Sequence, residues 1–369
     1  MMRYVLALNC GSSSLKYALF EVEEREQRAL VRDEVEGIGT KVPDHAAAVK
    51  SALDELSRYR MPEPDAIGHR IVHGGAKHVR AERIDDALIA SLKELVPLAP
   101  VHLPPEIRAI EAARARFPET AHVACFDTAF HRGMPPVAQR FPLPARLFDA
   151  GVQRYGFHGL SYEFVVESLG AKALGRAVIA HLGSGASLCA VRDGKSLDTT
   201  MGLTPTGGVV MGTRAGDLDP GLLVHLLQNG YDAAGLDKLV NHEAGLLGVS
   251  GTTSDMKRLL ELRARDASAA LAVEMFCASV RKAIGALATT LGGIDSLVFT
   301  GGIGARGGVV RREIARGLEH LGVQIEEARN EKNEAVISPA RSAVTVRAVV
   351  TDEERRIAQH AVRVLGEKG

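Results

Sequence analysis

A strand, a turn rich in glycine and serine, and a second strand occur in this order twice, and this repeat constrains the fold more than any other feature of the chain. The first copy has apolar strands at 5–8 and 15–20 around the turn at 9–14. The second copy has strands at 177–180 and 188–191, and Asp193-Gly194 then predicts a hairpin turn. We therefore expect a duplicated architecture with two lobes.

The turns indicate what the two lobes bind. Glycine and serine let several backbone N–H groups and hydroxyls point at one place, and Lys16 adds a positive charge beside the first turn. Such a concave set of donors with a cation is suited to a phosphate group. We expect the two hairpins to hold one phosphate chain from opposite sides. An ordinary hairpin with a solvated turn is the alternative for either copy alone.

Composition narrows the class of protein. At 369 residues the chain exceeds one comfortable core, so two domains are expected, and 46% apolar with 24% charged residues is typical of a soluble globular protein. The 45 basic and 45 acidic residues cancel, which argues against a nucleic-acid partner. We expect no membrane span, because no apolar run approaches ~20 residues, and no signal-peptide pattern opens the chain. Four scattered cysteines predict small core residues in a reducing cytoplasm.

Four charged or titratable residues stand in unusual settings. Arg70 lies within an apolar strand at 66–72, where a guanidinium needs a partner, catalytic or structural. Asp127 follows the strand at 120–126, at the edge where catalytic and metal-orienting carboxylates are common; a turn-forming role is the alternative. His158 stands between glycines before a helix N-terminus, where anions bind. Arg214 lies among small residues, so its guanidinium can reach a carboxylate or phosphate with two nitrogens.

The remaining elements follow from periodicity and caps. We predict stiff or surface loops at 97–105 and 134–144, a glycine turn at 301–304, and solvated helix faces around Arg311-Arg312 and Arg355-Arg356. The helix N-caps are Asp44, a residue within 251–255, and either Thr351 or Asp352. Strands are expected at 30–35, 297–300 and 344–350, and helices at 44–58, 85–95, 106–117, 160–173 and 267–291, with further helices following the 301–304 turn and beginning at 351–354.

Two nucleotide motifs compete with this interpretation. The stretch 302–307 matches the G-x-G-x-x-G pattern between a strand and a helix, with Glu326 further on, as in dinucleotide-binding proteins. It lies near the end of the chain, however, and leaves both hairpins unexplained. A P-loop is absent at 189–196, because Cys189 stands where its first glycine should be.

Taken together, these motifs resemble the acetate kinase family, within the larger superfamily of sugar kinases, actin and heat-shock ATPases. The resemblance runs nearly end to end, through the stretches 9–17, 68–75, 126–131, 154–159, 181–185, 211–220 and 299–304. It implies an α/β, two-lobed, duplicated ribonuclease H-like (actin-like ATPase) fold, with mixed sheets flanked by helices and an interlobe cleft. The lobes would be 1–130 plus 354–369, on the acyl and phosphate side, and 131–353, which binds the nucleotide.

The resemblance also implies a set of site residues. The catalytic residues would be Arg70, Asp127, His158 and Arg214, and the acyl substrate would contact Arg70, Val72, Val101 and Phe157. Mg²⁺ (or Mn²⁺) would be held by Asn9 and Glu353. The nucleotide and its phosphates would contact Asn9, Ser12, Ser14, Lys16, His181, Gly183, Ser184, Gly185, Asp255, Met256, Lys257, Gly301, Gly302, Ile303 and Gly304.

The chain departs from the family pattern at three places, and is somewhat short for the family. Ser184 replaces a usual asparagine, Ala305-Arg306 replaces a usual Glu-Asn, and Leu160 and Tyr162 replace a small polar residue and a histidine. The first two departures bear on the choice of phosphoryl donor.

The residue set predicts transfer of the ATP γ-phosphoryl group to acetate, reversibly and in line, giving acetyl phosphate and ADP. A carboxylate acceptor needs no general base, and two arginines would offset the repulsion between two anions. The alternatives are a propionate or other short-chain acyl kinase, a hydroxyl kinase with Asp127 as base, and a non-catalytic nucleotide-switched binding protein. From the family we also expect a homodimer.

Overall fold

In the computed structural model, residues 2–11, 13–23 and 26–367 are described. They pack into two compact units: unit 1 comprises 1–132, 157–164 and 352–369, and unit 2 comprises 133–156 and 165–351. The short segment 157–164 thus belongs to unit 1, although the segments on both sides of it belong to unit 2. No helix in the described part of the chain has the length and apolar character needed to span a membrane.

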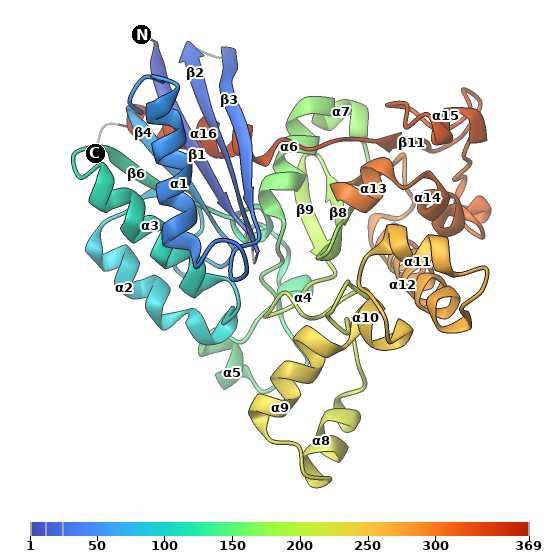
Figure 1. Cartoon of the computed structure of the whole chain (residues 1–369). Helices are drawn as coiled ribbons and strands as arrows, with labels where there is room; N and C mark the ends of the chain where they lie inside the picture. Colours follow the sequence, from blue (N-terminus) through green and yellow to red (C-terminus); the bar gives the residue numbers. More distant parts are fainter. Residues whose placement is uncertain (1, 12, 24–25, 368–369) are drawn as a thin grey trace. The chain divides into compact units, whose positions relative to one another are not determined.

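Unit 1 is built on a six-stranded mixed sheet with the strand order β3-β2-β1-β4-β6-β5 (Figure 1). The first three strands form antiparallel hairpins, whereas β1, β4 and β6 run parallel to one another. The strands are β1 (Arg3–Cys10), β2 (Ser14–Glu23), β3 (Glu26–Glu36), β4 (Ala66–Ile71), β5 (Glu82–Arg83) and β6 (Ala121–Phe126). The helices are α1 (His45–Arg58), α2 (Asp86–Glu94), α3 (Leu103–Arg116), the first part of α6 (Gly159–Leu169) and α16 (Glu353–Gly366), with 3-10 turns at Val96–Leu98 and Ala129–His131.

Unit 2 repeats this topology in a five-stranded sheet with the order β11-β10-β7-β8-β9. Here β7, β8 and β9 form the antiparallel hairpins, and β7, β10 and β11 run parallel. The strands are β7 (Ala177–Leu182), β8 (Ala186–Arg192), β9 (Lys195–Thr199), β10 (Ser296–Thr300) and β11 (Thr345–Ala348). The duplicated architecture expected from the two hairpins is therefore confirmed.

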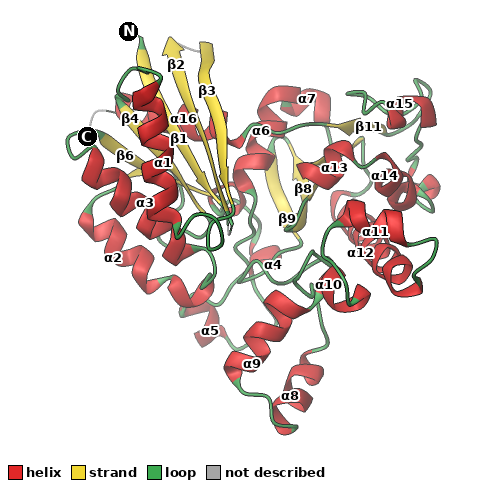
Figure 2. Ribbon diagram, viewed as in Figure 1, coloured by secondary structure: helices red, strands yellow, loops and turns green. Residues whose placement is uncertain are grey.

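The helices of unit 2 are more numerous and mostly short (Figure 2). The exception is α12 (Ala267–Leu291), whose bounds agree with the sequence prediction. The others are α4 (Pro136–Gln139), α5 (Ala145–Asp149), α7 (Ala171–Leu174), α8 (Pro220–Gln228), α9 (Ala233–Lys238), α10 (Gly245–Ser250), α11 (Met256–Leu262), α13 (Gly301–Arg306), α14 (Gly308–Ala315) and α15 (Glu327–Glu331). A π-helix spans Leu239–Glu243 and a 3-10 turn spans Glu319–Leu321.

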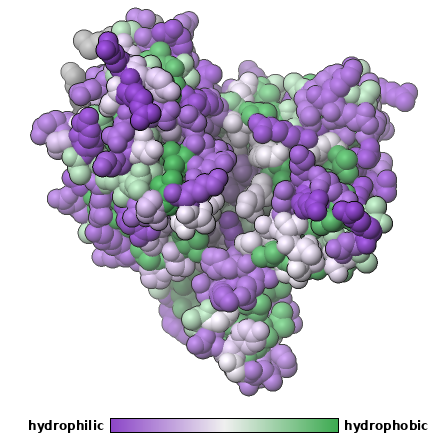
Figure 3. Space-filling view, in the orientation of Figure 1, coloured by the Kyte–Doolittle hydropathy of each residue, from purple (hydrophilic) through white to green (hydrophobic). Residues whose placement is uncertain are grey.

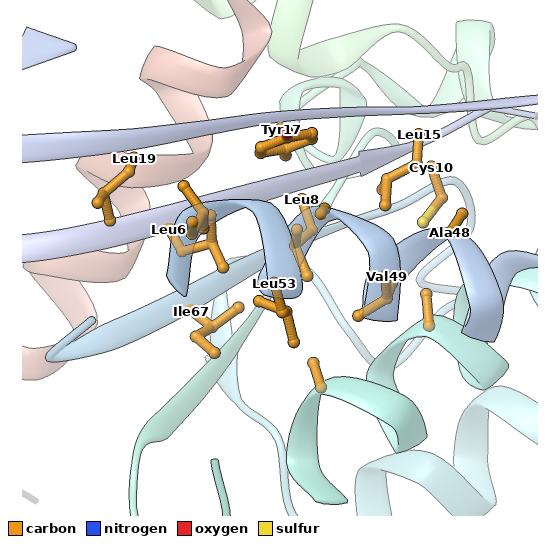
Figure 4. Close-up of a cluster of buried hydrophobic side chains, with 14 of the residues drawn as sticks. Leu6, Leu8, Cys10, Leu15, Tyr17, Leu19, Ala48, Val49, Leu53 and Ile67 are labelled. Atoms are coloured by element: carbon orange, nitrogen blue, oxygen red, sulfur yellow. The ribbon is translucent and has the colours of Figure 1, made fainter. Parts of the chain in front are cut away.

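The unit 1 sheet is buried on both faces, because alternate residues of each strand point to opposite sides. In β1, Leu6 and Leu8 pack with Leu53 of α1 (Figure 4). Val5 of the same strand lies in a second cluster with Ile357 of α16. Burying a leucine or isoleucine of this kind contributes about 1.5–3 kcal/mol, so these two layers hold the strand ends of unit 1 in place.

Most local signals are confirmed and three are wrong. Asp44, Asp255 and Asp352 cap their helices through side-chain acceptors. The expected loop at 97–105 ends early, because Pro104 and Pro105 lie in the first turn of α3, where a missing N–H costs nothing. The expected turn at 301–304 is the first turn of α13. The region 134–144 contains the short helix α4.

Candidate active site

The first hairpin brings Asn9 and Lys16 onto the same face of the unit 1 sheet, since they are register partners on β1 and β2. The turn is tighter than the sequence suggested: the strands extend to Cys10 and Ser14, and the Gly11 N–H donates to the Ser14 carbonyl at 2.8 Å. The Lys16 side chain is exposed and Asn9 is buried. Ser12, another predicted phosphate contact, lies outside the described residues.

Arg70 has the partner that its position in an apolar strand predicted. Its Nε and Nη2 both donate to Oδ2 of Asp127, at 3.1 and 2.7 Å, and its Nη1 donates to Oδ1 of Asn9 at 3.3 Å. Burial acts against the charge, but Asp127 and the neighbouring Glu353 raise the pKa of Arg70, so it stays protonated. The parallel strands β1, β4 and β6 place these groups together at their carboxyl ends.

The Asp127 carboxylate is buried and can accept more hydrogen bonds than it receives from Arg70. Burial raises its pKa, an effect that Arg70 opposes. Its second carboxylate oxygen, Oδ1, is buried and has no hydrogen-bond partner among the residues that the structure describes. An orphaned buried carboxylate oxygen is costly unless a ligand, a water or a cation completes it.

The first turn of α16 adds two acids to this group. The Asn9 amide donates to Glu353 Oε2 at 3.0 Å and to Glu354 Oε1 at 2.7 Å. Burial, together with the neighbouring Glu353, raises the pKa of Glu354. One arginine therefore faces several carboxylates within a single unit, and such oxygen-rich surroundings suit a divalent cation. The described residues contain no ready-made cluster of three or more acidic, histidine or cysteine ligands.

Glu106 is a member of this site that sequence reasoning missed. It is 2% exposed, and the Val72 N–H donates to its two oxygens at 3.3 and 3.1 Å. Burial raises the pKa of Glu106 to about 8, although Arg70 acts to lower it. A signal was available: Leu103, Glu106 and Ile110 fall on one apolar stripe of α3, where an acid is unexpected.

His158 adopts the unusual backbone conformation that its flanking glycines predicted. Its φ is +58°, in the left-handed region, and Gly159 follows it directly. A Cβ on Gly159 would lie 2.1 Å from the Asp127 carbonyl, which accepts the Gly159 N–H at 3.0 Å. The start of α6 is thereby fixed against the end of β6. A left-handed non-glycine residue persists only where the surrounding structure enforces it.

The residues predicted for the acyl pocket lie in unit 1. Val72 and Phe157 are buried, and Val101 is half-buried in the turn before α3. The Phe157 ring packs edge-on against His73, with centroids 5.4 Å apart. The Phe157 carbonyl accepts a hydrogen bond from His131 at 3.0 Å.

The second hairpin repeats the first with different chemistry. His181 and Ser187 are register partners, as Asn9 and Lys16 are in unit 1, and the Gly183 N–H donates to the Gly185 carbonyl at 3.0 Å. The Ser184 carbonyl accepts from Gly212 at 3.0 Å, which joins the hairpin to the loop that carries Arg214.

Arg214 makes hydrogen bonds to backbone groups through both its side chain and its own carbonyl. Its Nη1 donates to the Pro205 carbonyl at 2.7 Å, and its own carbonyl accepts from Met211 at 3.1 Å. Gly245, with φ +63°, opens α10 against this loop, where a Cβ would lie 2.2 Å from the Met211 carbonyl. The loop therefore has a defined path.

The residues predicted for the adenosine end are brought near the same hairpin. A Cβ at Gly301 would lie 2.5 Å from the Leu182 carbonyl, and one at Gly212 would lie 3.5 Å from Cβ of Ser254, beside Asp255. Asp255 caps α11, its Oδ1 accepting the Lys257 N–H at 3.0 Å. The side chain of Met256 is buried, so only its backbone remains for a nucleotide.

Arg311 corrects the prediction of a solvated face at 311–312. It is 0% exposed and donates to the Gly304 carbonyl, to both oxygens of Asn330 and to Oδ1 of Asn333 at 2.7–2.8 Å. Burial lowers the pKa of Arg311 to about 10. It fixes the end of α13 through neutral acceptors, which no sequence pattern indicated.

Comparison with known proteins agrees with the fold. The crystal structure of Porphyromonas gingivalis acetate kinase superimposes with a TM-score of 0.86 at 37% identity, covering 98% of this chain and 100% of that chain. A propionate kinase from Francisella tularensis superimposes with a TM-score of 0.91 at 35% identity, covering 98% of this chain and 100% of that chain. With its two mixed sheets flanked by helices, the chain has the actin-like kinase fold and is a phosphotransferase.

The family follows from the sequence comparisons. The model of the acetokinase family matches residues 4–359. An acetate kinase of Methylocella silvestris is 42% identical, over 99% of this chain and 98% of that protein. A propionate kinase of Yersinia enterocolitica is 40% identical, over 98% of this chain and 95% of that protein. The chain belongs to the acetokinase family.

Proposed function

We propose that this protein is an acetate kinase, which transfers the γ-phosphoryl group of ATP to acetate and runs the reaction in both directions. The observation that carries the proposal is the partly buried Arg70, held between Asp127 and Asn9 in a chain of the acetokinase family. A charged guanidinium fixed in this way suits an anionic acceptor better than a neutral one.

The state of Asp127 favours a carboxylate acceptor over an alcohol. A hydroxyl kinase needs a general base, and the pairing with Arg70 acts to lower the pKa of Asp127, which weakens it as a base. Acetate is ionised at neutral pH and gives up no proton. Asp127 thus acts to orient Arg70, and the site needs no base.

The other residues of the proposed site act on the negative charges of the acceptor and of the nucleotide phosphates. Arg70, Arg214 and His158 neutralise the acceptor and the negative charge that develops on the transferring phosphoryl group. Asn9, Ser12, Ser14 and Lys16, with the 183–185 turn and His181, bind the phosphates, and Asp255, Met256, Lys257 and the start of α13 hold the adenosine. The peptide N–H groups of the two hairpin turns support this assignment.

A magnesium ion fits the residues of unit 1. Asn9 and Glu353 would hold it, next to the orphaned Asp127 oxygen. When bound with the nucleotide, Mg²⁺ or Mn²⁺ would offset the charge of the phosphate oxygens. A site with few protein ligands is normal for Mg²⁺, which keeps waters and phosphate oxygens in its shell.

Acetate and propionate differ by one methylene, and an apolar pocket formed by Val72, Val101 and Phe157 would separate them by about 1–3 kcal/mol. The relatives named above include enzymes of both names. We favour acetate because the family is named for it, and keep short-chain acyl kinase activity as the second candidate.

The test is formation of acyl phosphate, trapped with hydroxylamine as the hydroxamate, for acetate, propionate and butyrate with ATP, GTP and pyrophosphate as donors. We expect acetate with ATP to give the highest kcat/KM. Glucose serves as the alcohol acceptor with which the carboxylates are compared. Phosphorylation of glucose without any hydroxamate would overturn the proposal, as would ATP binding with no acceptor-dependent release of ADP.

We also propose a homodimer in a reducing, cytoplasmic compartment. All four cysteines are free and buried, which supports the compartment. The dimer is supported by α8, an apolar helix with no buried residue: Leu222, Val224 and Leu227 are 40, 53 and 49% exposed, and apolar side chains lie on this part of the surface in Figure 3. Leu227→Asp should shift the mass measured by light scattering from dimer to monomer, whereas Val137→Asp, at an 86% exposed position on α4, should not.

A further inference from the structure

A group of charged side chains in unit 1 lies outside the residues assigned above. The Glu163 carboxylate on α6 accepts from Arg356 Nη2 at 2.9 Å and from His360 Nε2 at 2.6 Å, both on α16. Arg363 Nη2 lies 3.0 Å from the other ring nitrogen of His360. The sequence predicted a solvated face around Arg356, but its side chain is 15% exposed and that of Glu163 is 18% exposed.

Opposite charges meet in this group. Burial acts to raise the pKa of Glu163, yet the hydrogen bond from His360 and the charge of Arg356 lower it to about 2. Partly buried, charge-assisted hydrogen bonds of this kind are among the stronger polar contacts in proteins. We call Glu163, Arg356 and His360 the α6–α16 clamp.

The clamp joins two elements that each begin with a residue of the proposed site. Glu163 lies one turn after His158 and Gly159 at the start of α6. On α16, Glu353, Arg356 and His360 fall on one stripe, at spacings of three and four residues. One end of this stripe contacts Asn9 through Glu353, and the following turns contact Glu163.

The clamp also lies where the chain passes between the two units. The unit boundary in α6 falls between Phe164 and Val165, directly after Glu163, and another falls between Thr351 and Asp352, shortly before Arg356. At this crossing Glu163 is bonded to two residues of its own unit, Arg356 and His360. His158 precedes α6 in a left-handed conformation that persists only where its surroundings enforce it.

We propose that Glu163 is a positioning residue for phosphoryl transfer: through Arg356 and His360 it fixes the start of α6, with His158, relative to the start of α16, with Glu353. This inference rests on the proposed function for its catalytic consequence. The side chain contacts its neighbours on α16 and takes no part in the chemistry.

Glu163→Gln is the direct test, because it keeps the shape and removes the charge. We expect kcat for acetyl phosphate formation to fall about 10- to 100-fold, with the KM for ATP changed less than about twofold, since misplacing a reacting group costs rate more than binding. Glu163→Asp, which keeps the charge at shorter reach, should recover part of the loss. The matched control is Asp295→Asn in unit 2. Asp295 is another ion-paired carboxylate whose pKa is lowered to about 2. The kcat of this variant should stay within about twofold of wild type.

A purely structural role is excluded by a double-mutant cycle with His158→Asn. If Glu163 acts through His158, adding Glu163→Gln to His158→Asn should lower kcat by less than about threefold, whereas Asp295→Asn should combine multiplicatively with it. Multiplicative effects of Glu163→Gln, or a kcat within twofold of wild type, would overturn the inference. If Glu163→Gln does not fold, His360→Gln carries the same test.

Amide hydrogen exchange separates this inference from the proposed function. In Glu163→Gln the protection of segments 157–162 and 353–356 should fall, and in Asp295→Asn it should not. Loss of that difference would refute the clamp whatever the enzyme's substrate. A wild-type protein that forms no acyl phosphate from any carboxylate would instead refute the proposed function.

Discussion

The two units share one strand topology but bury different kinds of groups. Near the carboxyl ends of its parallel strands, unit 1 buries the acidic side chains Glu106, Asp127 and Glu354, beside the partly buried Arg70. Among the described residues of unit 2, Arg311 is the buried charged one, and it bonds to neutral acceptors. The hairpin of unit 2 offers peptide N–H groups and hydroxyls instead.

This difference indicates that the two copies of the fold contribute different chemical groups to a phosphotransferase. Buried charges are expensive and are kept where they act on a reacting anion. Neutral donors from glycine-rich backbone bind phosphate with little dependence on protonation state. We therefore expect substitutions of buried charges in unit 1 to change stability and rate together, and those of the unit 2 loops to change the rate with a smaller loss of stability.

Arg70→Ala should give the largest effect. It leaves Asp127 buried without its cation, so we expect kcat to fall about 10³-fold and the free energy of unfolding to fall by about 3–5 kcal/mol. The checks are the hydroxamate assay and urea denaturation. A stability loss below about 1 kcal/mol would show that Asp127 is not the buried, dependent partner described here.

Arg214→Ala is the matched experiment in unit 2. We expect kcat to fall on the order of 10³-fold, as for other arginines at phosphoryl-transfer transition states. Stability should fall by only about 1–2 kcal/mol, as expected for the loss of the hydrogen bond from Arg214 to the Pro205 carbonyl. A rate loss under tenfold would make Arg214 structural, and a stability loss equal to that of Arg70→Ala would break the contrast between the units.

His131→Gln tests the cost of burying titratable groups in unit 1. Burial lowers the pKa of His131 to about 4, so the folded protein holds it neutral, whereas the unfolded chain binds its proton below about pH 6.5. Stability therefore falls as the pH drops from 6.5 to 4, by about 3 kcal/mol for this residue. Glutamine can keep the hydrogen bond to Phe157. The difference between wild type and variant, measured by denaturation at each pH, should change by that amount, and an unchanged difference would contradict the burial argument.

Gly159→Ala should lower the free energy of unfolding by about 1–3 kcal/mol, because the added Cβ would meet the Asp127 carbonyl and force the start of α6 to shift. Gly302→Ala, at a position where a Cβ meets nothing within 4 Å, is the control in unit 2. Thermal unfolding and kcat measure the outcome. Equal behaviour of the two variants would mean that the junction of β6 and α6 is not closely packed.

Some of the site could be predicted from single residues, and some could not. That Arg70 needs a partner follows from the cost of an unpaired buried cation, and that Asp127 ends a strand follows from the apolar run before it. That the two meet depends on β4 and β6 being neighbours, which local pattern does not state. Glu106 was missed although its place on the apolar stripe of α3 was visible, and Arg311 was assigned to a solvated face because a basic pair on a helix usually is one.

The sequence by itself determined the duplicated hairpins, the long helix at 267–291, the aspartate caps and the special backbone of His158, because each depends on residues within a few positions of one another. Only the tertiary structure decided which charges meet: Asn9 with Glu353, Arg70 with Asp127, and Glu163 with Arg356. Those pairs join segments distant along the chain, and burial strengthens the interaction within each pair. Burial is a property of the packed fold and cannot be assigned to any residue alone.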